Sequence, residues 1–332
     1  KAATTTSDVT VPDTISVGNI IYKVTAIDKY AFSGINSLVN LTIAEGIITI
    51  GSNAFQNCNN MQRVTLPSSL TQIGDYAFDY CGSLTSIHLP TQLKEIKSYA
   101  FCNCTSLVIP TLPESLETIG QWAFGYCQGN SISIPASVKK IGSGALSGCE
   151  NLTSISVSSG NSNYSSQDCN AIIEKNSNTL IAGCQTTNIP NTIGCIGKWA
   201  FCGQKKMTSI TIPSSVTMID SLAFNNSGLT TITIPANARS IAYRAFAFCN
   251  DLKTITSLIE SPVAIPEDVF MNTREGIESP YTSGTLYVPK GTKATYQATE
   301  GWNLFEKIVE QEPFTERSEE RRVGKECRSR WS

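Results

Sequence analysis

The chain has 332 residues, a formal net charge of −2 and an isoelectric point near 5.6. Hydrophobic residues make up 41%, which is ample for a folded core, whereas charged residues make up only 16%, so we expect a mostly neutral, polar surface. No Lys/Arg run occurs before the last few residues, which argues against nucleic-acid binding, and no stretch approaches the ~18 apolar residues of a membrane span.

The first part of the chain has the periodicity of strands. Residues 9–24 alternate apolar and polar side chains around Gly18-Asn19, a dipeptide typical of tight hairpin turns. We therefore predict two strands joined by this turn, with residues 1–24 forming a β-hairpin cap over the first coil. Because residue 1 is Lys and no apolar segment follows it, we expect any leader to have been removed.

The main body of the chain is a repeat. An Ala-Phe pair, once Ala-Leu, recurs in steps of 23, 23, 23, 23, 22, 55, 23 and 22 residues, and its second members are Phe32, Phe55, Phe78, Phe101, Phe124, Leu146, Phe201, Phe224 and Phe246. Units this short cannot close a core of their own, so they bury apolar side chains only against the units before and after them. The repeat predicts a solenoid with coils in residues 25–157 and 193–260.

Each unit is expected to hold one strand and one tight return. Leu84, Ile87 and Leu89 point inward from an extended segment, which ends at Pro90 because proline cannot donate to a strand ladder. About ten to eleven such strands, stacked in parallel at about 4.8 Å, give a sheet about 50 Å long. The Ile-Gly-x-x-Ala-Phe part of the unit favours a turn at Gly, close approach at Ala and short strand or 3₁₀ pieces rather than long helices.

The step of 55 residues marks an insertion. It contains one additional coil and about ten further residues. Two short apolar runs, 171–174 and 179–182, flank Lys-Asn-Ser-Asn, which is typical of a hairpin. We predict a repeat with an inserted, protruding hairpin in residues 158–192. Such loops often bind partners, although the insertion is equally explained as ordinary structure.

The repeat frame returns near the C-terminus and then stops. Residues 286–289 repeat the strand pattern, and 293–305 can form one amphipathic helix despite Gly301, so we predict a capping coil and helix in residues 261–311. Residues 312–332 lose the apolar periodicity and carry five of the nine arginines of the chain. We interpret them as a disordered or non-native tail; a basic interaction tail is the alternative.

Cysteines recur in phase with the repeat. Six of them lie three residues after the Phe position: Cys58, Cys81, Cys104, Cys127, Cys149 and Cys249. Adjacent coils would bring them close enough for disulfides, but a buried thiol ladder needs no pairing and suits the apolar character of cysteine. With one His and no CxxC pair, the sequence offers no metal site, and with no recurring pair of carboxylates it offers no catalytic pair. We predict no enzyme activity and no cofactor.

Small polar side chains recur at one outward position of the predicted strands. They lie between two inward apolar residues and therefore project from one face of the sheet, which we expect to be concave. We call this row the hydroxyl strip; its members are Thr42, Thr65, His88, Thr111, Ser133, Ser156, Thr211, Thr233 and Thr256. A neutral polar ligand, such as a glycan or a protein surface, would suit it. The alternative is that Thr is simply a good strand residue.

A second row is aromatic and precedes the Ala of the Ala-Phe pairs. Its members are Tyr30, Tyr76, Tyr99, Trp122 and Trp199. Stacked aromatic rings can hold sugars, but packing between coils on the convex side is the explanation that we favour.

The repeat unit resembles a known family. The pattern Cys-x-x-Leu-x-x-Ile-x-Leu-Pro-x-x-Leu-x-x-Ile-Gly-x-x-Ala-Phe is similar to the BspA-like leucine-rich repeat of bacterial and protist surface proteins, and the resemblance covers about residues 9–310. It implies a right-handed horseshoe or superhelix with a parallel sheet, export to the cell surface or beyond, and adhesion to host or microbial partners.

The repeat and the resemblance together favour a recognition module. We predict a non-enzymatic, cell-surface or secreted module that binds a host extracellular-matrix protein or a microbial surface protein through the hydroxyl strip. The alternative is a carbohydrate-binding module, which would take a glycan as its partner, or a purely structural stalk.

Overall fold

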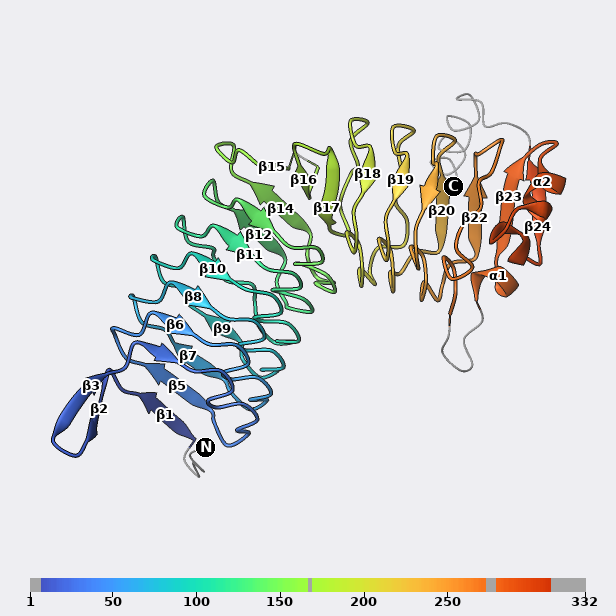
Figure 1. The fold of residues 1–332 in the computed structure, drawn as a ribbon. Coiled ribbons are helices and arrows are strands. Elements are labelled where there is room, and N and C mark those ends of the chain that lie inside the picture. The colour runs from blue at the N-terminus through green and yellow to red at the C-terminus, as the bar shows by residue number, and fades with distance from the viewer. Residues whose placement is uncertain (1–6, 167–168, 273–278, 312–332) are drawn as a thin grey trace, which may run out of the picture.

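The computed structural model describes residues 7–166, 169–272 and 279–311. The chain forms a β-solenoid of about 12 turns with about 23 residues per turn and very little helix (Figure 1). This confirms the predicted solenoid of leucine-rich-repeat type. The tail predicted at residues 312–332 lies outside the described residues.

One row of parallel strands carries the x-Ile-x-Leu part of each unit. It is divided into three sheets, which contain β1 (Asp8–Val11), β5 (Asn40–Ile43), β7 (Arg63–Thr65) and β9 (Ser86–Ile87); then β12 (Ser131–Ile134) and β14 (Ser154–Val157); then β20 (Thr231–Ile234), β22 (Thr254–Ser257), β23 (Thr285–Pro289) and β24 (Ile308–Gln311). We call this row the first sheet row. Leu84, Ile87 and Leu89 are buried, as the repeat predicts.

A second row of short strands carries the residues before the Gly of the Ile-Gly-x-x-Ala-Phe pattern, a position that Asp28, Lys97, Asp220 and Ala242 fill in four units, together with the strands of the insertion. It contains β4 (Ala26–Ile27), β6 (Thr49–Ile50), β8 (Gln72–Ile73), β10 (Glu95–Ile96), β11 (Thr118–Ile119) and β13 (Lys140–Ile141), followed by β15 (Tyr164–Ser165), β16 (Ala171–Glu174), β17 (Thr179–Gly183), β18 (Cys195–Ile196), β19 (Met218–Ile219) and β21 (Ser240–Ile241). The third side of each coil is the turn that carries Ala-Phe. We call this side the turn edge.

The phenylalanines of the repeat stack along the inside of the solenoid. Phe32, Phe55, Phe78, Phe101 and Phe124 form one ladder with ring centroids 5.2–5.7 Å apart. Phe201, Phe224, Phe246 and Phe270 form a second ladder with spacings of 5.0–5.2 Å. The Ala before each Phe donates to a carbonyl within its own turn, and the Phe donates to the Ala carbonyl of the next coil, as in Phe78 to Ala100 at 2.8 Å. Stacked rings and these hydrogen bonds hold neighbouring coils together.

The glycine of the Ile-Gly-x-x-Ala-Phe pattern has a different role from the predicted one. Its backbone does not adopt a positive φ, so it is not required for the turn. A Cβ at Gly74 would lie 2.7 Å from the carbonyl carbon of Gly51, and one at Gly120 would lie 2.3 Å from the backbone nitrogen of Ser98. At these glycines successive coils touch backbone to backbone, although Asp28, Lys97, Asp220 and Ala242 occupy the same position in other units.

The N-terminal segment contains three strands rather than the two predicted. β1 joins the first sheet row beside β5, and the hairpin around Gly18-Asn19 consists of β2 (Thr14–Val17) and β3 (Ile20–Lys23). All eight residues of β2 and β3 are exposed, and the hairpin stands out from the body in Figure 1. The first sheet row is therefore covered at this end by β1, because β1 continues the strand pattern of the coils and the hairpin does not.

The insertion does form a hairpin, but the hairpin does not protrude. β16 pairs antiparallel with β15 and β17, and β17 pairs parallel with β18. Ile172 packs in the core of the coils before it, whereas Ala171 and Ile173 pack in the core of the coils after it. Only the tip, residues 175–178, is exposed. The prediction of a protruding hairpin is wrong because both apolar faces of the hairpin are buried between two stacks of coils.

The insertion acts as a wedge and bends the solenoid. On the turn edge the coils on either side of it are in direct contact: the Gly148 N–H donates to the Cys202 carbonyl at 2.8 Å, and Trp122 meets Trp199 with centroids 5.5 Å apart. On the opposite side β15, β16 and β17 separate β13 from β18. Extra strands on one side and none on the other tilt the coils, and Figure 1 shows the change of direction between β14 and β18.

The C-terminal end closes the second Phe ladder with a cluster of rings. Phe270 contacts the edges of Tyr281 and Phe305, and Trp302 is fully buried. The predicted single helix over residues 293–305 is wrong. The structure has α1 (Pro280–Ser283), α2 (Lys293–Ala298) and a separate 3₁₀ turn, Trp302–Leu304. The α2 helix ends because Thr299 has an extended backbone, and Gly301 with φ 79° precedes the 3₁₀ turn.

Candidate functional site

The members of the predicted hydroxyl strip occupy the same position in successive coils; His88, Thr111 and Thr211 lie outside the strands and the other members lie on them. Thr42 pairs with Thr65 in the register of β5 and β7, Ser133 with Ser156 in β12 and β14, and Thr233 with Thr256 in β20 and β22. The inward neighbours of these residues are buried, so the strip side chains project outward. Their geometry follows directly from the strand alternation of the repeat.

The exposure of the strip departs from the prediction at one end. The other eight members are exposed, but Thr256 is 7% exposed. Strand β22, which carries Thr256, pairs with β23, and the residue opposite Thr256 is Tyr287. Tyr287 is half-buried and its side chain is much larger than that of threonine. Thr256 is therefore covered by its neighbour and cannot belong to an accessible surface.

Sequence reasoning missed part of the same surface. Asn188 is exposed and occupies the strip position inside the insertion, one residue before Ile189-Pro190, which corresponds to Leu89-Pro90. A second outward position lies two residues earlier in most units; the unit of Thr111 has the buried Ile109 there. This companion row contains Asn40, Arg63, Ser86, Ser131, Ser154, Ser209, Thr231 and Thr254. Strand alternation could have identified both, because within a strand a residue two positions from an outward residue also faces outward.

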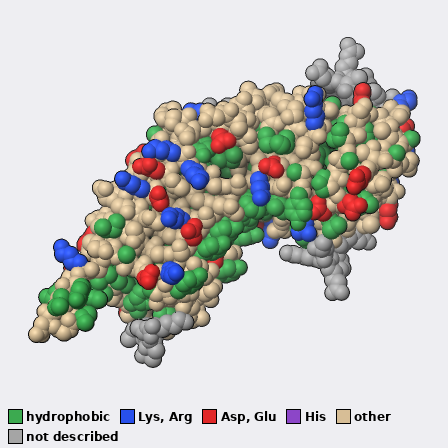
Figure 2. Space-filling model, in the orientation of Figure 1, with side chains coloured by type: hydrophobic (Ala, Val, Ile, Leu, Met, Phe, Trp, Pro, Cys, Tyr) green, Lys and Arg blue, Asp and Glu red, His purple; other side chains and the backbone are tan. Residues whose placement is uncertain are grey.

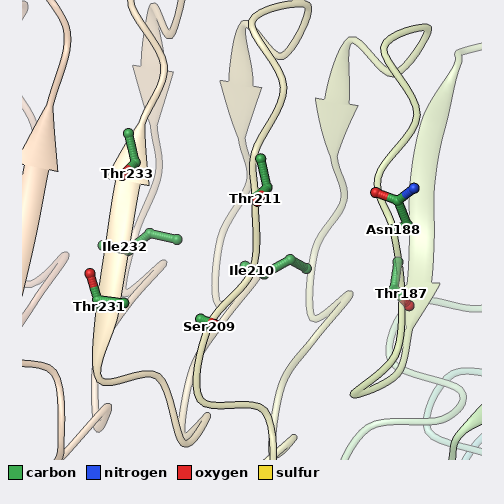
Figure 3. Close-up of a pocket in the computed structure, with 8 residues that line it drawn as sticks. All are labelled: Thr187, Asn188, Ser209, Ile210, Thr211, Thr231, Ile232 and Thr233. Carbon is green, nitrogen blue, oxygen red and sulfur yellow. The ribbon is translucent and has the colours of Figure 1, made fainter. Parts of the chain in front are cut away.

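A polar hollow lies on this surface just after the wedge. Thr187 and Asn188, Ser209 and Thr211, and Thr231 and Thr233 line it from three successive segments; Figure 3 shows these side chains. The middle segment is not part of any sheet ladder, and β14 and β20 on either side belong to different sheets. The hollow is thus a break in the first sheet row, and it is lined largely by hydroxyl and amide groups.

The cysteines of the repeat are free and buried, which confirms the predicted thiol ladder. Each thiol donates to the carbonyl of the Phe in the preceding coil, as in Cys81 to Phe55 at 3.3 Å and Cys104 to Phe78 at 3.1 Å. Burial raises the pKa of the Cys58 and Cys249 thiols to about 11. A buried, protonated thiol is a poor nucleophile and a poor metal ligand, so the ladder serves packing.

The predicted aromatic row lies on the turn edge and is partly stacked. Tyr76 and Tyr99 stack at 4.6 Å with parallel rings, Trp122 continues the stack 6.4 Å beyond Tyr99, and Trp199 meets Trp122 edge-on across the wedge. Tyr30 is exposed and lies apart from this group. The row therefore does pack between coils, but it is also part of a larger feature.

The aromatic row forms one side of a trough of about 540 Å³. We call it the aromatic trough; its lining residues are Tyr76, Asp79, Tyr80, Tyr99, Cys102, Asn103, Trp122, Tyr126 and Trp199. Asp79 and Cys102 are buried and lie at its bottom, whereas Tyr80 is 50% exposed. Figure 2 shows hydrophobic side chains gathered along the lower edge of the central part of the molecule, where the turns of these coils lie in Figure 1.

The aromatic residues of the trough occupy backbone positions that disfavour them. Each turn has two residues with positive φ, four positions apart, such as Tyr76 (56°) and Tyr80 (59°). In other coils the same positions hold Gly34, Asn53, Asn57, Gly144, Gly148, Gly203 and Asn226, which tolerate this conformation, and also Tyr30, Leu222, Arg244 and Phe248, which do not favour it. A left-handed conformation costs about 1–2 kcal/mol for an ordinary residue, and stacking of about 0.5–1.5 kcal/mol per pair offsets only part of this.

Asp79 is the only charged side chain that is buried among the described residues. Its Oδ2 accepts from Gln56 Nε2 at 3.0 Å and its Oδ1 accepts from Asn103 Nδ2 at 3.2 Å. Burial raises the pKa of this carboxyl. No cation is paired with it among the ion pairs of the described residues, which are Lys139 with Glu117 and Arg244 with Asp268.

Comparisons with known proteins identify the same type of repeat. The family model of the BspA type leucine rich repeat region matches in six copies, over residues 13–107, 71–180 and 172–287. The chain belongs to this family. Proteins of this family are typically non-enzymatic and lie at the cell surface or outside the cell, and the family suggests a protein-interaction or adhesion module.

Solved structures of similar proteins support the same assignment. A leucine rich cell surface protein from Faecalibacterium prausnitzii is 26% identical, with 95% of this chain and 89% of that chain covered and a TM-score of 0.62. A leucine-rich repeat protein from Eubacterium ventriosum is 27% identical, with 76% and 68% covered and a TM-score of 0.64. The pneumococcal vaccine antigen PcpA, 20% identical over 94% and 90%, shares the fold with a TM-score of 0.66.

A comparison with curated proteins gave no significant match. Within the described part of the chain, no helix has the length and apolar character needed to cross a membrane. The same residues contain no group of three His, Cys, Asp or Glu side chains placed to hold a metal ion.

Proposed function

We propose that the chain is a non-enzymatic recognition module of the cell surface or extracellular space, and that it binds a protein partner through the hydroxyl strip and its companion row. The observation that carries the proposal is the exposure of two adjacent outward rows on the first sheet row. Together they form a long and almost uncharged surface. It is rich in hydroxyl groups, which both donate and accept hydrogen bonds.

The composition of this surface favours a protein partner that offers hydrogen-bonding groups. Arg63 and His88 are the only ionisable side chains in the two rows as defined, so the surface neither attracts nor repels a charged partner strongly. Repeat proteins present extended surfaces of this kind, which allow many modest contacts to add up. A host extracellular-matrix protein or a microbial surface protein fits this description.

The polar hollow after the wedge supplies a concave part of the surface. It draws side chains from three segments, and the insertion contributes Thr187 and Asn188 to it. The insertion therefore takes part in the proposed site through its own coil and not through the tip of its hairpin. We place the centre of the contact at this hollow.

The test is binding to immobilised collagen, laminin and intact bacterial cells, measured by surface plasmon resonance or cell adhesion. A double variant with Thr65→Lys and Thr211→Lys places two charges on the proposed surface and should weaken binding about tenfold or more, because unpaired charges are then buried at the contact. The matched control, Thr91→Lys with Thr105→Lys, adds the same charge at exposed positions outside the two rows and should bind normally. Equal binding by both double variants would exclude the proposed surface.

A further inference from the structure

We propose that the aromatic trough is a second binding site, separate from the hydroxyl strip, and that it takes a neutral oligosaccharide lying along the turn edge. The trough is built from two lines of side chains that start four residues apart in the same turns, with Tyr76, Tyr99 and Trp122 on one side and Tyr80 and Tyr126 on the other. Nothing in the coil architecture requires aromatic residues there.

The choice of residues at these positions is the first argument. Many of the positive-φ positions in other coils hold Gly or Asn, which that backbone favours, although Tyr30, Leu222, Arg244 and Phe248 also occupy such positions. In the trough five aromatic residues gather in three successive coils, and Trp199 joins them from across the wedge. Strained residues that cluster at one surface site are typical of binding sites, since there the side chain is kept for its contacts.

The bottom of the trough is the second argument. The Asp79 carboxylate is buried there, and Gln56 and Asn103 hold its two oxygens in place without neutralising its charge. An ionised carboxylate has about four lone-pair sites, and the two amide donors together with the Tyr80 backbone N–H leave about one of them unused. A ligand hydroxyl group would supply the missing donor.

The aromatic side chains and the buried Asp79 carboxylate together favour a sugar as the ligand. A pyranose ring has apolar C–H faces that pack against Tyr and Trp, and hydroxyl groups that both donate to a carboxylate and accept from an amide or phenol. A proline-rich peptide would also pack against aromatic rings, but proline has no N–H and could not satisfy Asp79. A small organic cation would leave most of a 540 Å³ trough empty, and Lys198 already places its Nζ 4.4 Å above the Trp199 ring at one end.

The test uses neutral hexasaccharides of glucose, xylose, mannose and N-acetylglucosamine as probes. Binding to the full chain is measured by calorimetry and by tryptophan fluorescence, because Trp122 and Trp199 line the trough. We expect at least one probe to bind. The double variant Tyr80→Asn with Tyr126→Asn should then weaken binding about tenfold or more, since it removes two rings that pack against the ligand.

The variant is chosen so that folding is preserved. Asn occupies the same backbone position at positive φ in Asn57, Asn103 and Asn226 of neighbouring coils, so the substitution suits the turn. The control Tyr30→Asn has the same chemistry at an exposed position outside the trough and should bind the probe normally. No binding of any probe at millimolar concentration, equal affinity of the double variant, or binding of decaproline in place of the sugars would overturn the proposal.

The two proposed sites can be separated experimentally. The Thr65→Lys and Thr211→Lys variant should retain sugar binding, and the Tyr80→Asn and Tyr126→Asn variant should retain binding to the protein partner. Failure of one proposal therefore leaves the other standing.

Discussion

The two arms of the solenoid, residues 25–157 before the wedge and 193–260 after it, have separate cores of the same kind but differ in the details around them. Both have a Phe ladder with nearly the same spacing. The thiol ladder, in contrast, is continuous only in the first arm, because Gln204 and Ser227 replace two cysteines in the second. Both replacements are buried and hydrogen-bonded, Gln204 to the Cys149 carbonyl and Ser227 to the Cys249 thiol.

This difference separates what the coil requires from what it tolerates. The Phe position holds a ring in every unit except that of Leu146, because each ring is the packing surface for the next coil. After Ile35 in the first unit, the position three residues later holds Cys, Gln or Ser, which hydrogen-bonds to a neighbouring coil, so cysteine is one of several residues that meet this need. The cysteines at this position of the repeat are therefore packing residues.

The largest expected effect tests whether the two interiors are equivalent. Phe78→Ala in the first arm and Phe224→Ala in the second each remove a fully buried ring that is stacked on both sides. Each should lower the free energy of unfolding by about 3–5 kcal/mol, measured by urea denaturation. If one substitution costs only a small fraction of the other, the two arms do not share the same kind of core.

A smaller effect tests the contact between the arms at the wedge. A Cβ at Gly183 would lie 2.1 Å from Cε1 of Phe201, the first ring of the second ladder. Gly183→Ala should therefore destabilise the chain by about 1–3 kcal/mol, because the wedge and the ring must move apart. The control Gly194→Ala adds a Cβ with nothing within 4 Å and should change stability by less than about 1 kcal/mol. Equal effects of the two variants would contradict the close packing of the wedge.

The smallest expected effect is on the pH dependence of stability. It concerns Cys249, which lies at the repeat position where the two arms differ. Burial raises the pKa of Cys249 from its ordinary 9.0 to about 11, so the protonated thiol is favoured in the folded state. Its contribution to stability is fully present below pH 9 and is lost as the pH rises toward 11. Cys249→Ser, which copies Ser227 of the preceding coil, should show a smaller loss of stability over that range than the wild type. Identical urea midpoints at every pH would show that the thiol does not contribute.

The sequence alone determined the solenoid, the coil length, the strand of each unit and the outward direction of the hydroxyl strip. These follow from the spacing of Phe and of the inward Leu and Ile, because a period of about 23 residues with alternating burial admits no compact alternative. The family assignment rests on the same spacing. The buried thiols were also predictable, since they share the phase of the Phe residues.

Only the tertiary structure decided how the insertion is used and where the trough lies. The hairpin of residues 171–183 is apolar on both faces, and its fate depends on there being a stack of coils on each side to bury it. Thr256 is covered by Tyr287 through a strand pairing that spans about thirty residues of sequence. The aromatic trough requires side chains from several coils and a bend that brings Trp199 to Trp122, and such distances between coils are set by packing, which no local pattern encodes.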